Sequence, residues 1–521
     1  MYNTRYMFEA NRTYRIIDMF GAPRARHAIF IPVLLLVIVA ELVALAPFTL
    51  SGSAERLFSG KSSTISITSP KAYQVLQRGA DDTADIAISG TYSGTPEAIE
   101  ASWNGGAWET IVSEPSGGTY SGVLVSQKAG QGNLRVRFAD NVEVSASNAY
   151  VGVGDIYVVA GQSNASGRGF NSQSYTHASL NASLFGNDGQ WKRLTDPTDS
   201  NTNQVDGVSA DSYAAGSPWP LLATSILADQ SVPVAFVVAP KGGTSIYQWQ
   251  KNSDGSVSPS DRTPYSSCST ALDASGLYGN MKRQIDGAGG KIKAVLFFQG
   301  EQDARNVLET SQESYEGYLN CFIDNVYADF GAPTVSGMIH IYAGKATASA
   351  LDTIRAAQKA VWDENEHAIA GPVMVDVDVT AGDGVHFMTN SEIQIFANRW
   401  WAALKNNLYG GTDDGRGPRI QSAQYNQEKT ELILSFADDS GLSAGSVSVR
   451  VFSVVDERSP IAVVRVERLS ATQLSLTLSR AASGSITVSL ASGSAGIRGK
   501  MPYDASAFSL PAEPFTVVAT P

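Results

Sequence analysis

Four short polar segments of the chain carry side chains whose types could together perform nucleophilic catalysis. In residues 161–164, Gly-Gln-Ser-Asn, a serine follows an apolar run, and the glycine before it permits a tight turn. If a helix follows, its free N–H groups point to the same place. This suits a nucleophile whose own amide helps to bind an oxyanion. Ser163 is therefore the candidate nucleophile.

Asp383 and His386 are the candidates for the groups that activate this serine. They lie three residues apart, between an apolar run and a helical stretch. His386 can take the hydroxyl proton because histidine titrates near neutrality, and Asp383 can hold its tautomer and stabilise the imidazolium. The other histidines fit less well, since they lie before an apolar stretch, in polar or acidic segments, or inside an apolar run: His27, His177, His367 and His340.

Two further segments could supply groups around a reacting carbonyl. The pair Gly242 and Gly243 lets the backbone approach a ligand and present an N–H donor. Gln299 could offer a side-chain amide to the same oxyanion. Glu301 and Asp303 form a pair of carboxylates such as a glycosidase uses. Two residues of one loop rarely flank a bond from opposite faces, so an esterase site is favoured.

The elements that must position these segments are predicted by the apolar pattern of residues 152–407. Apolar runs alternate there with helix-like segments, and the runs begin at Ile156, Val234, Ile292, Val335 and Pro372. This alternation predicts a parallel sheet covered by helices on both faces. Five such units predict a flavodoxin-like, doubly wound α/β domain, in which ligands bind at the carboxyl ends of the strands.

The segments on either side of this domain have a different pattern. Residues 61–150 and 416–521 contain short runs of alternating apolar and polar residues, punctuated by glycine and proline. Each segment predicts a β-sandwich. The two sandwiches could position the catalytic domain or grip a glycan.

The four segments resemble the sialate O-acetylesterase and acetylxylan esterase group of the SGNH hydrolase superfamily. The resemblance rests on residues 161–164, on Gly-Gly-Thr-Ser-Ile at 242–246 followed by Trp249, on Gln-Gly-Glu at 299–301, and on Asp-x-x-His at 383–386. Residues 502–515 are also similar to the tails of multidomain members. In this group the Gln-Gly-Glu block stands where many SGNH enzymes carry an asparagine.

The resemblance implies a role for each of these residues and no metal or other cofactor. Ser163 would be the nucleophile, His386 the base and Asp383 the residue that orients it. The oxyanion hole would consist of the amide of Ser163, an amide of Gly242 or Gly243 and the side chain of Gln299, with Gln162, Asn164 and Glu301 supporting the site. The expected activity is a serine esterase that removes O-acetyl groups from sialic acid or a polysaccharide through an acetyl-enzyme. The alternatives are a lipid or aryl esterase, an acyltransferase of the same fold, and an inactive surface glycan-binding protein.

Charge and cysteine content narrow the possible partners. The net charge of −12 and the pI of about 5.0 argue against a nucleic-acid partner, because no basic face is available to neutralise phosphates. Cys268 and Cys321 are the two cysteines, and their spacing does not resemble a metal site. A disulfide between them and two free buried thiols both stay open.

The N-terminal residues predict the compartment. Residues 1–27 carry several arginines, and residues 28–50 are apolar apart from Glu41, long enough to cross a hydrocarbon core of about 30 Å. Positive charge before the span predicts a cytoplasmic N-terminal segment and an extracytoplasmic catalytic domain, periplasmic or at the cell surface. We favour an uncleaved signal anchor. The alternative is a signal peptide cleaved after a small residue such as Ala54, which would give a secreted protein.

Overall fold

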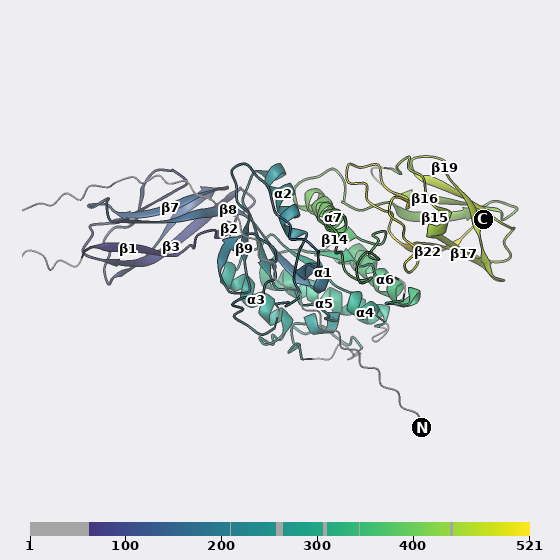
Figure 1. Cartoon of the computed structure of the whole chain (residues 1–521), viewed down its shortest axis with the longest axis horizontal. Coiled ribbons are helices and arrows are strands. Elements are labelled where there is room, and N and C mark those ends of the chain that lie inside the picture. The colour runs from purple at the N-terminus through teal and green to yellow at the C-terminus, as the bar shows by residue number, and fades with distance from the viewer. Residues whose placement is uncertain (1–61, 209, 257–263, 306–309, 343, 438–440) are drawn as a thin grey trace, which may run out of the picture. The chain divides into compact units, whose positions relative to one another are not determined.

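The computed structural model describes residues 62–208, 210–256, 264–305, 310–342, 344–437 and 441–521 (Figure 1). Residues 61–521 form one compact unit. The predicted cytoplasmic segment 1–27 and membrane span 28–50 lie outside the described residues. Within the described part of the chain, no helix combines the length and the apolar character that crossing a membrane requires. The membrane anchor therefore stays a prediction.

Two packed sheets make up the N-terminal part of the unit. Strands β1, β3 and β6 form one sheet, and β4, β5 and β7 form the other together with the first half of β8. Alternate residues of the strands, such as Ile86 and Ile88 of β3 and Leu134 and Val136 of β7, fill a shared core. The bounds are β1 (Thr64–Ser69), β2 (Val75–Gln77), β3 (Thr83–Ser93), β4 (Ile99–Trp103), β5 (Glu109–Val112), β6 (Thr119–Lys128), β7 (Gly130–Phe138) and β8 (Ser145–Gly161).

Strand β8 belongs to both the sandwich and the catalytic sheet. Its first half pairs antiparallel with β7, and its second half pairs parallel with β11 and β12. The predicted boundary between residues 150 and 152 therefore falls inside one continuous strand. Both halves of β8 are hydrogen-bonded to neighbouring strands. This pairing positions the turn that follows Gly161.

The catalytic sheet has the strand order β10-β9-β11-β8-β12-β13-β14. The five predicted apolar runs form β8, β11, β12, β13 and β14. Numbered along the chain they lie in the order 2-1-3-4-5, which is the flavodoxin-like order. The short strands β9 and β10, which the apolar pattern did not predict, extend the sheet at one edge. The bounds are β9 (Ser183–Phe185), β10 (Trp191–Arg193), β11 (Val234–Val238), β12 (Ala294–Phe298), β13 (Thr334–Met338) and β14 (Ala368–Val373).

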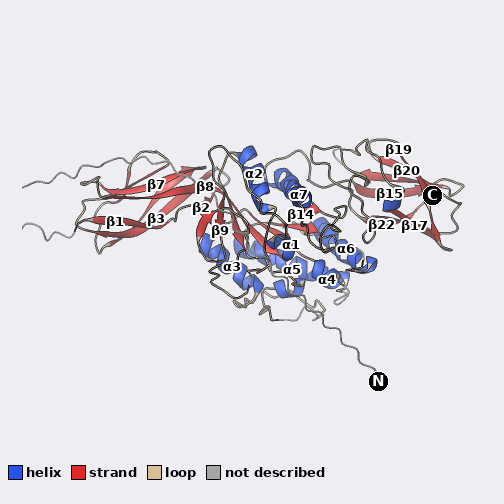
Figure 2. Cartoon of the chain, viewed as in Figure 1, coloured by secondary structure: helices blue, strands red, loops and turns tan. Residues whose placement is uncertain are grey.

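Helices cover both faces of this sheet, and two neighbouring residues of β12 show it. Successive side chains of a strand point to opposite faces. Phe298 contacts Phe396 of α7 with ring centroids 4.7 Å apart, whereas Phe297 stacks on Phe322 of α5 at 4.4 Å. Among the described residues, the α-helices lie in the middle segment (Figure 2). Their bounds are α1 (Ser163–Ser166), α2 (Trp219–Gln230), α3 (Leu277–Ala288), α4 (Glu301–Ala304), α5 (Gln312–Phe330), α6 (Ala348–Glu364) and α7 (Asn390–Leu408), with a 3-10 turn η1 (Ile246–Trp249).

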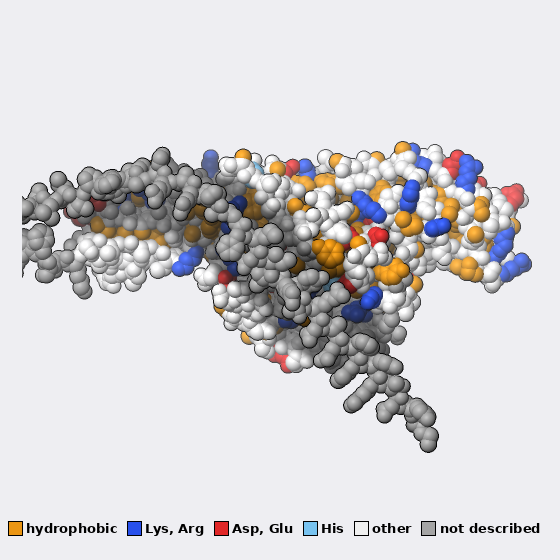
Figure 3. Space-filling view, viewed as in Figure 1, with side chains coloured by type: hydrophobic (Ala, Val, Ile, Leu, Met, Phe, Trp, Pro, Cys, Tyr) orange, Lys and Arg blue, Asp and Glu red, His pale blue; other side chains and the backbone are white. Residues whose placement is uncertain are grey.

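The C-terminal part consists of two further antiparallel sheets, with strand orders β15-β16-β20-β19 and β18-β17-β21-β22. Their shared core continues into the edge of the catalytic sheet through Met338, Trp362 and Val373. On the face shown in Figure 3, basic and acidic side chains are spread over these strands. The bounds are β15 (Arg419–Tyr425), β16 (Glu431–Ala437), η2 (Val449–Val451), β17 (Phe452–Asp456), β18 (Pro460–Ile461), β19 (Val463–Arg468), β20 (Gln473–Leu478), β21 (Ile486–Leu490) and β22 (Phe515–Ala519).

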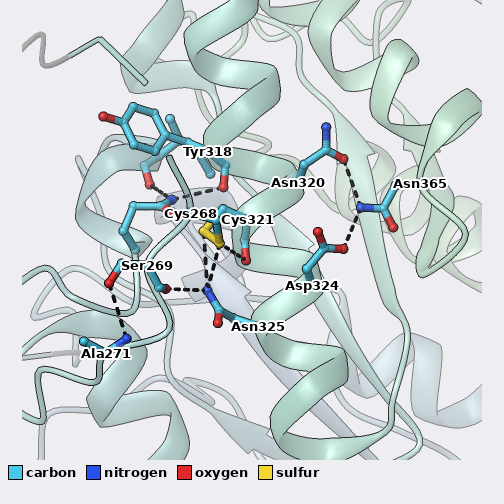
Figure 4. The surroundings of a disulfide bond; sticks show 11 residues. Cys268, Ser269, Ala271, Tyr318, Asn320, Cys321, Asp324, Asn325 and Asn365 are labelled. Atoms are coloured by element: carbon cyan, nitrogen blue, oxygen red, sulfur yellow. Dashed lines mark hydrogen bonds between the residues drawn. A yellow bond between two sulfur atoms is a disulfide. The ribbon is translucent and has the colours of Figure 1, made fainter. Parts of the chain in front are cut away.

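The two cysteines form a disulfide (Figure 4). Cys268 lies in the loop before α3, and Cys321 lies on α5. The side-chain amide of Asn325 donates to the carbonyl of Ser269 at 3.0 Å and also approaches both sulfurs. The bond therefore attaches a long surface loop to the helix that covers one face of the sheet, and the alternative of two free thiols was wrong.

A buried carboxylate joins the C-terminal part to the catalytic domain. Asp376 follows β14 and is 1% exposed. It accepts hydrogen bonds from Arg399 of α7 at 2.7 and 3.0 Å, from Tyr503 at 2.5 Å and from Arg498 at 3.2 Å. Burial favours the neutral acid, but the arginine charges and these hydrogen bonds outweigh it and lower the pKa of Asp376 to about 2.

Replacing this carboxylate should destabilise the whole unit. Asp376→Asn leaves the buried guanidinium of Arg399 without its counter-charge, so we expect the free energy of unfolding to fall by about 3–5 kcal/mol. Urea denaturation at pH 7 measures it, with the exposed neighbour Asp378→Asn as the control. Because the folded pKa is depressed, this stabilisation is present above about pH 4 and is lost as the pH falls toward 2. Equal stability of the two variants would contradict the role of Asp376.

Candidate active site

The turn that carries Ser163 exists because Gly161 precedes it. Gly161 pairs with Phe298 of β12 and has a φ of +112°. A Cβ at this position would lie 2.1 Å from the carbonyl oxygen of Phe298, so a side chain does not fit. The chain then turns at Gln162, and Ser163 becomes the first residue of α1. As the first helical residue, Ser163 has an N–H group without a partner inside the helix.

Ser163, His386 and Asp383 form a hydrogen-bonded chain, as the sequence predicted for a triad. The Nε2 atom of His386 lies 2.7 Å from Oγ of Ser163, and its Nδ1 atom lies 2.6 Å from Oδ2 of Asp383. The other carboxylate oxygen of Asp383 accepts from the backbone N–H groups of Val385 and His386, both at 3.0 Å. This is the geometry in which a histidine can remove a proton from a serine.

The environment keeps His386 in its basic form. Burial lowers the pKa of His386 below its ordinary value of 6.5, and the hydrogen bond and negative charge of Asp383 only partly oppose this. Burial would raise the pKa of Asp383, but the backbone and side-chain hydrogen bonds from His386 outweigh it and lower that pKa. At neutral pH the imidazole is therefore neutral and the carboxylate charged.

Asn164 holds the loop of His386 against the turn of Ser163. Its Nδ2 atom donates to the carbonyl of Val385 at 3.2 Å, and its Oδ1 atom accepts from the N–H of Phe387 at 3.0 Å. The same Nδ2 donates to Oε1 of Glu301 at 2.7 Å. One amide thus fixes the peptide groups on both sides of His386, and Asn164 is a positioning residue.

Glu301 is a buried carboxyl at the wall of the active-site cavity. It is fully buried, and its Oε2 atom has no hydrogen-bond partner among the described residues. Burial raises its pKa to about 7, against the hydrogen bond from Asn164. Asp303 instead accepts from Ile246 and Gln299 inside the domain. Glu301 and Asp303 therefore accept hydrogen bonds from different groups inside the protein.

Gln299 does not take the place that the sequence predicted for it. Its side chain is 1% exposed and does not line the cavity. Its Nε2 atom donates to Asp303 at 2.6 Å and to the carbonyl of Thr244 at 2.9 Å, so its two amide hydrogens are used inside the protein. Gln162 does line the cavity, and its Oε1 accepts from the same Nε2 at 3.2 Å. The prediction of Gln299 as an oxyanion donor is corrected: it holds the glycine loop through Thr244.

Gly242 and Gly243 do line the cavity beside Ser163 and His386. Among the described residues, no protein group accepts a hydrogen bond from their N–H groups. Gly243 has a φ of +73°, and a Cβ at Gly242 would lie 2.3 Å from Oδ2 of Asp211. These two N–H groups and that of Ser163 are thus the available donors for an oxyanion.

A buried ion pair in the cavity wall was missed by the sequence reasoning. Arg168 donates to Asp211, and both side chains are largely buried next to Gly242. Arg168 stands five residues after Ser163 and could have been noticed for that reason, but Asp211 belongs to a distant loop without a recognisable motif. The cavity has a volume of about 620 Å³, and further residues that line it are Tyr213, Lys241, Arg305, Val385 and Met388. Within the described residues, no group of three or more His, Cys, Asp or Glu side chains could hold a metal ion.

Loss of the Asn164 amide should slow the reaction of Ser163 without unfolding the protein. Asn164→Ala frees both peptide groups next to His386, and a misplacement of about 1 Å costs about a hundredfold in rate. The rate of Ser163 labelling by a fluorophosphonate probe measures this directly. Asn171→Ala, an exposed asparagine after the same motif, is the matched control. Equal labelling rates in both variants would show that Asn164 does not position His386.

Comparison with known proteins gives a consistent picture. Residues 153–403 match the family described as carbohydrate esterase, sialic acid-specific acetylesterase. A probable carbohydrate esterase of Arabidopsis thaliana is 24% identical over 273 residues, which cover 48% of this chain and 90% of that protein. A solved structure of a carbohydrate acetylesterase from Xanthomonas citri has a TM-score of 0.58 at 18% identity, covering 86% of this chain and 98% of that one. At this identity the structural likeness shows the fold.

Proposed function

We propose that residues 153–403, which match the family described as carbohydrate esterase, sialic acid-specific acetylesterase, form a carbohydrate esterase domain and make the chain a carboxylic ester hydrolase. From this premise we propose that it removes O-acetyl groups from carbohydrates through an acetyl-enzyme on Ser163. The observation that carries the proposal is the continuous hydrogen-bonded chain from Asp383 through His386 to Ser163. The cavity around it can hold a sugar ring.

Each step uses a group that the structure brings to the cavity. His386 takes the proton of Ser163 through Nε2 while Oγ attacks the acetyl carbonyl, and Asp383 stabilises the imidazolium that forms. The negative charge on the carbonyl oxygen is bound by the N–H groups of Ser163 and of Gly242 or Gly243. The imidazolium then returns the proton to the departing sugar oxygen. Water, deprotonated by the same imidazole, releases acetate.

The cavity wall favours a sugar over a lipid. Charged and amide side chains line it on several sides, among them Asn201, Gln302 and Arg305. Sugar hydroxyls can hydrogen-bond to such groups, whereas a long acyl chain would leave them unpaired, which costs free energy. This supports the carbohydrate esterase over the lipid esterase among the alternatives.

We also propose that the catalytic domain lies outside the cytoplasm. The Cys268–Cys321 disulfide supports this location, because such bonds persist in oxidising compartments. The predicted span 28–50 would hold the domain there.

The nucleophile is tested by a pair of serine variants that line the same cavity. Ser163→Ala should lower the rate of acetate release by about 10⁴-fold or more, whereas Ser212→Ala should retain activity because its hydroxyl lies outside the triad. The substrates are acetylated xylan, O-acetyl sialic acid and 4-nitrophenyl acetate, and released acetate is measured. If the folded wild-type protein releases no acetate from any of them, the proposed acetyl specificity is wrong.

The pH profile tests the state of His386. Only the neutral imidazole can accept the proton of Ser163, and burial lowers its pKa. The value of kcat/KM for 4-nitrophenyl acetate should therefore rise with pH through a midpoint below 6.5 and be nearly constant at neutral pH. Asp383→Asn removes the charge that favours the imidazolium, and activity should fall by about 10⁴-fold. A wild-type midpoint above 6.5 would contradict the role of burial.

A further inference from the structure

A second cavity lies in the N-terminal sandwich, away from the triad. Its volume is about 590 Å³, and the turn between β4 and β5, the start of β7 and the middle of β8 line it. The side chains that matter for the argument are Trp108, Tyr150, Asn104, Asn133, Arg135 and Ser179. Aromatic rings and convergent polar groups around a cavity are the features of a ligand site.

Polar side chains of this cavity are available to hydrogen-bond with a ligand. Among the described residues, no protein group hydrogen-bonds to the side chains of Asn104 or Asn133, and the guanidinium of Arg135 lies 5.4 Å from the ring centroid of Trp108. Amide and guanidinium groups can donate to several oxygens at once, and an amide can accept as well. Sugar hydroxyls offer such donors and acceptors in pairs, and the C–H face of a pyranose ring packs on aromatic rings such as those of Trp108 and Tyr150.

Neighbouring side chains pack against the two aromatic rings of the cavity. The guanidinium of Arg137 lies 4.0 Å from the ring centroid of Trp108 and is itself paired with Glu100 at 2.8 Å. Tyr150 is 41% exposed and stacks on Tyr73 with ring centroids 4.7 Å apart. Fixed aromatic groups bind a ligand at lower entropic cost than mobile ones.

The backbone around the cavity is strained, which also points to a function. Tyr73 and Tyr150 have φ values of +64° and +60°. Positive φ is a genuine outlier for bulky residues and persists where the surroundings enforce it, often at binding sites. The side chain of Gln131 adds rigidity, because it exchanges hydrogen bonds of 3.1 and 2.8 Å with the backbone of Asn181 in the loop that carries Ser179.

The distance between this cavity and the triad indicates how long a ligand must be to contact both. Tyr150 and Gly161 both lie on β8, and at about 3.3 Å per residue the part between them is roughly 35 Å long. A single sugar that occupies the active site cannot reach that far. We propose that this cavity is a glycan-binding site and that the esterase therefore acts on polysaccharides whose chain engages both places. The substrate part of this inference rests on the proposed function, whereas the binding part does not.

Binding is tested on the full-length chain carrying Ser163→Ala, with deacetylated xylan and a deacetylated sialic acid polymer, so that no ester occupies the active site. Calorimetry should detect binding of at least one polymer, and Trp108→Ala should weaken it by about tenfold or more. Asn133→Ala, which breaks no hydrogen bond of the protein, should also weaken it. Tyr327→Ala, an exposed tyrosine on α5, is the matched control and should leave the affinity unchanged.

Activity measurements separate this inference from the proposed function. With Ser163 intact, Trp108→Ala and Asn133→Ala should hydrolyse 4-nitrophenyl acetate at the wild-type rate but release acetate from dilute acetylated polymer about tenfold more slowly. If the wild type binds none of the polymers, or binds them as tightly after both substitutions, the glycan site is wrong even where the esterase is active. If the wild type binds polymer but hydrolyses no ester, the proposed function is wrong and the binding site stands.

Discussion

The close approach of β8 and β12 is the constraint on which the active site depends. Gly161 passes the carbonyl of Phe298 at a distance that excludes any Cβ, and this brings the carboxyl ends of the two central strands together. Ser163 then begins a helix beside the loop that follows β12. Asn164 and Glu301, one from each loop, can therefore meet at 2.7 Å, and Asn164 in turn holds the loop of His386. A larger residue at 161 would separate all of these groups.

Several ionisable side chains of the domain are buried, and the groups that contact each one decide how burial affects its pKa. Asp376 stays charged because two arginines and a tyrosine surround it. Glu301 has one hydrogen bond to an amide and no counter-charge, so burial raises its pKa to about 7. His386 is kept neutral by burial while Asp383 still orients it. At Asp376 the charged and hydrogen-bonding partners thus outweigh burial and stabilise the interface with the C-terminal part, whereas at His386 burial itself prepares the base for catalysis.

The accessory sheets are connected to the catalytic domain in two different ways. The N-terminal sandwich shares strand β8 with the catalytic sheet, so Tyr150, which lines its cavity, and Gly161, which precedes the turn of Ser163, lie on one strand. The C-terminal sheets share a hydrophobic core with β13, β14 and α6, and bury Asp376 against α7.

The sequence by itself determined the parallel sheet and the loops that meet at its edge, because apolar runs and glycine turns are local signals. It therefore predicted that Ser163, Asp383 and His386 would converge. It could not determine partners that come from distant loops. Gln299 is drawn inward by Asp303 and Thr244, Arg168 pairs with Asp211, and Cys268 bonds to Cys321. Only the tertiary structure decided these contacts, since each depends on where two segments far apart in the chain come to lie.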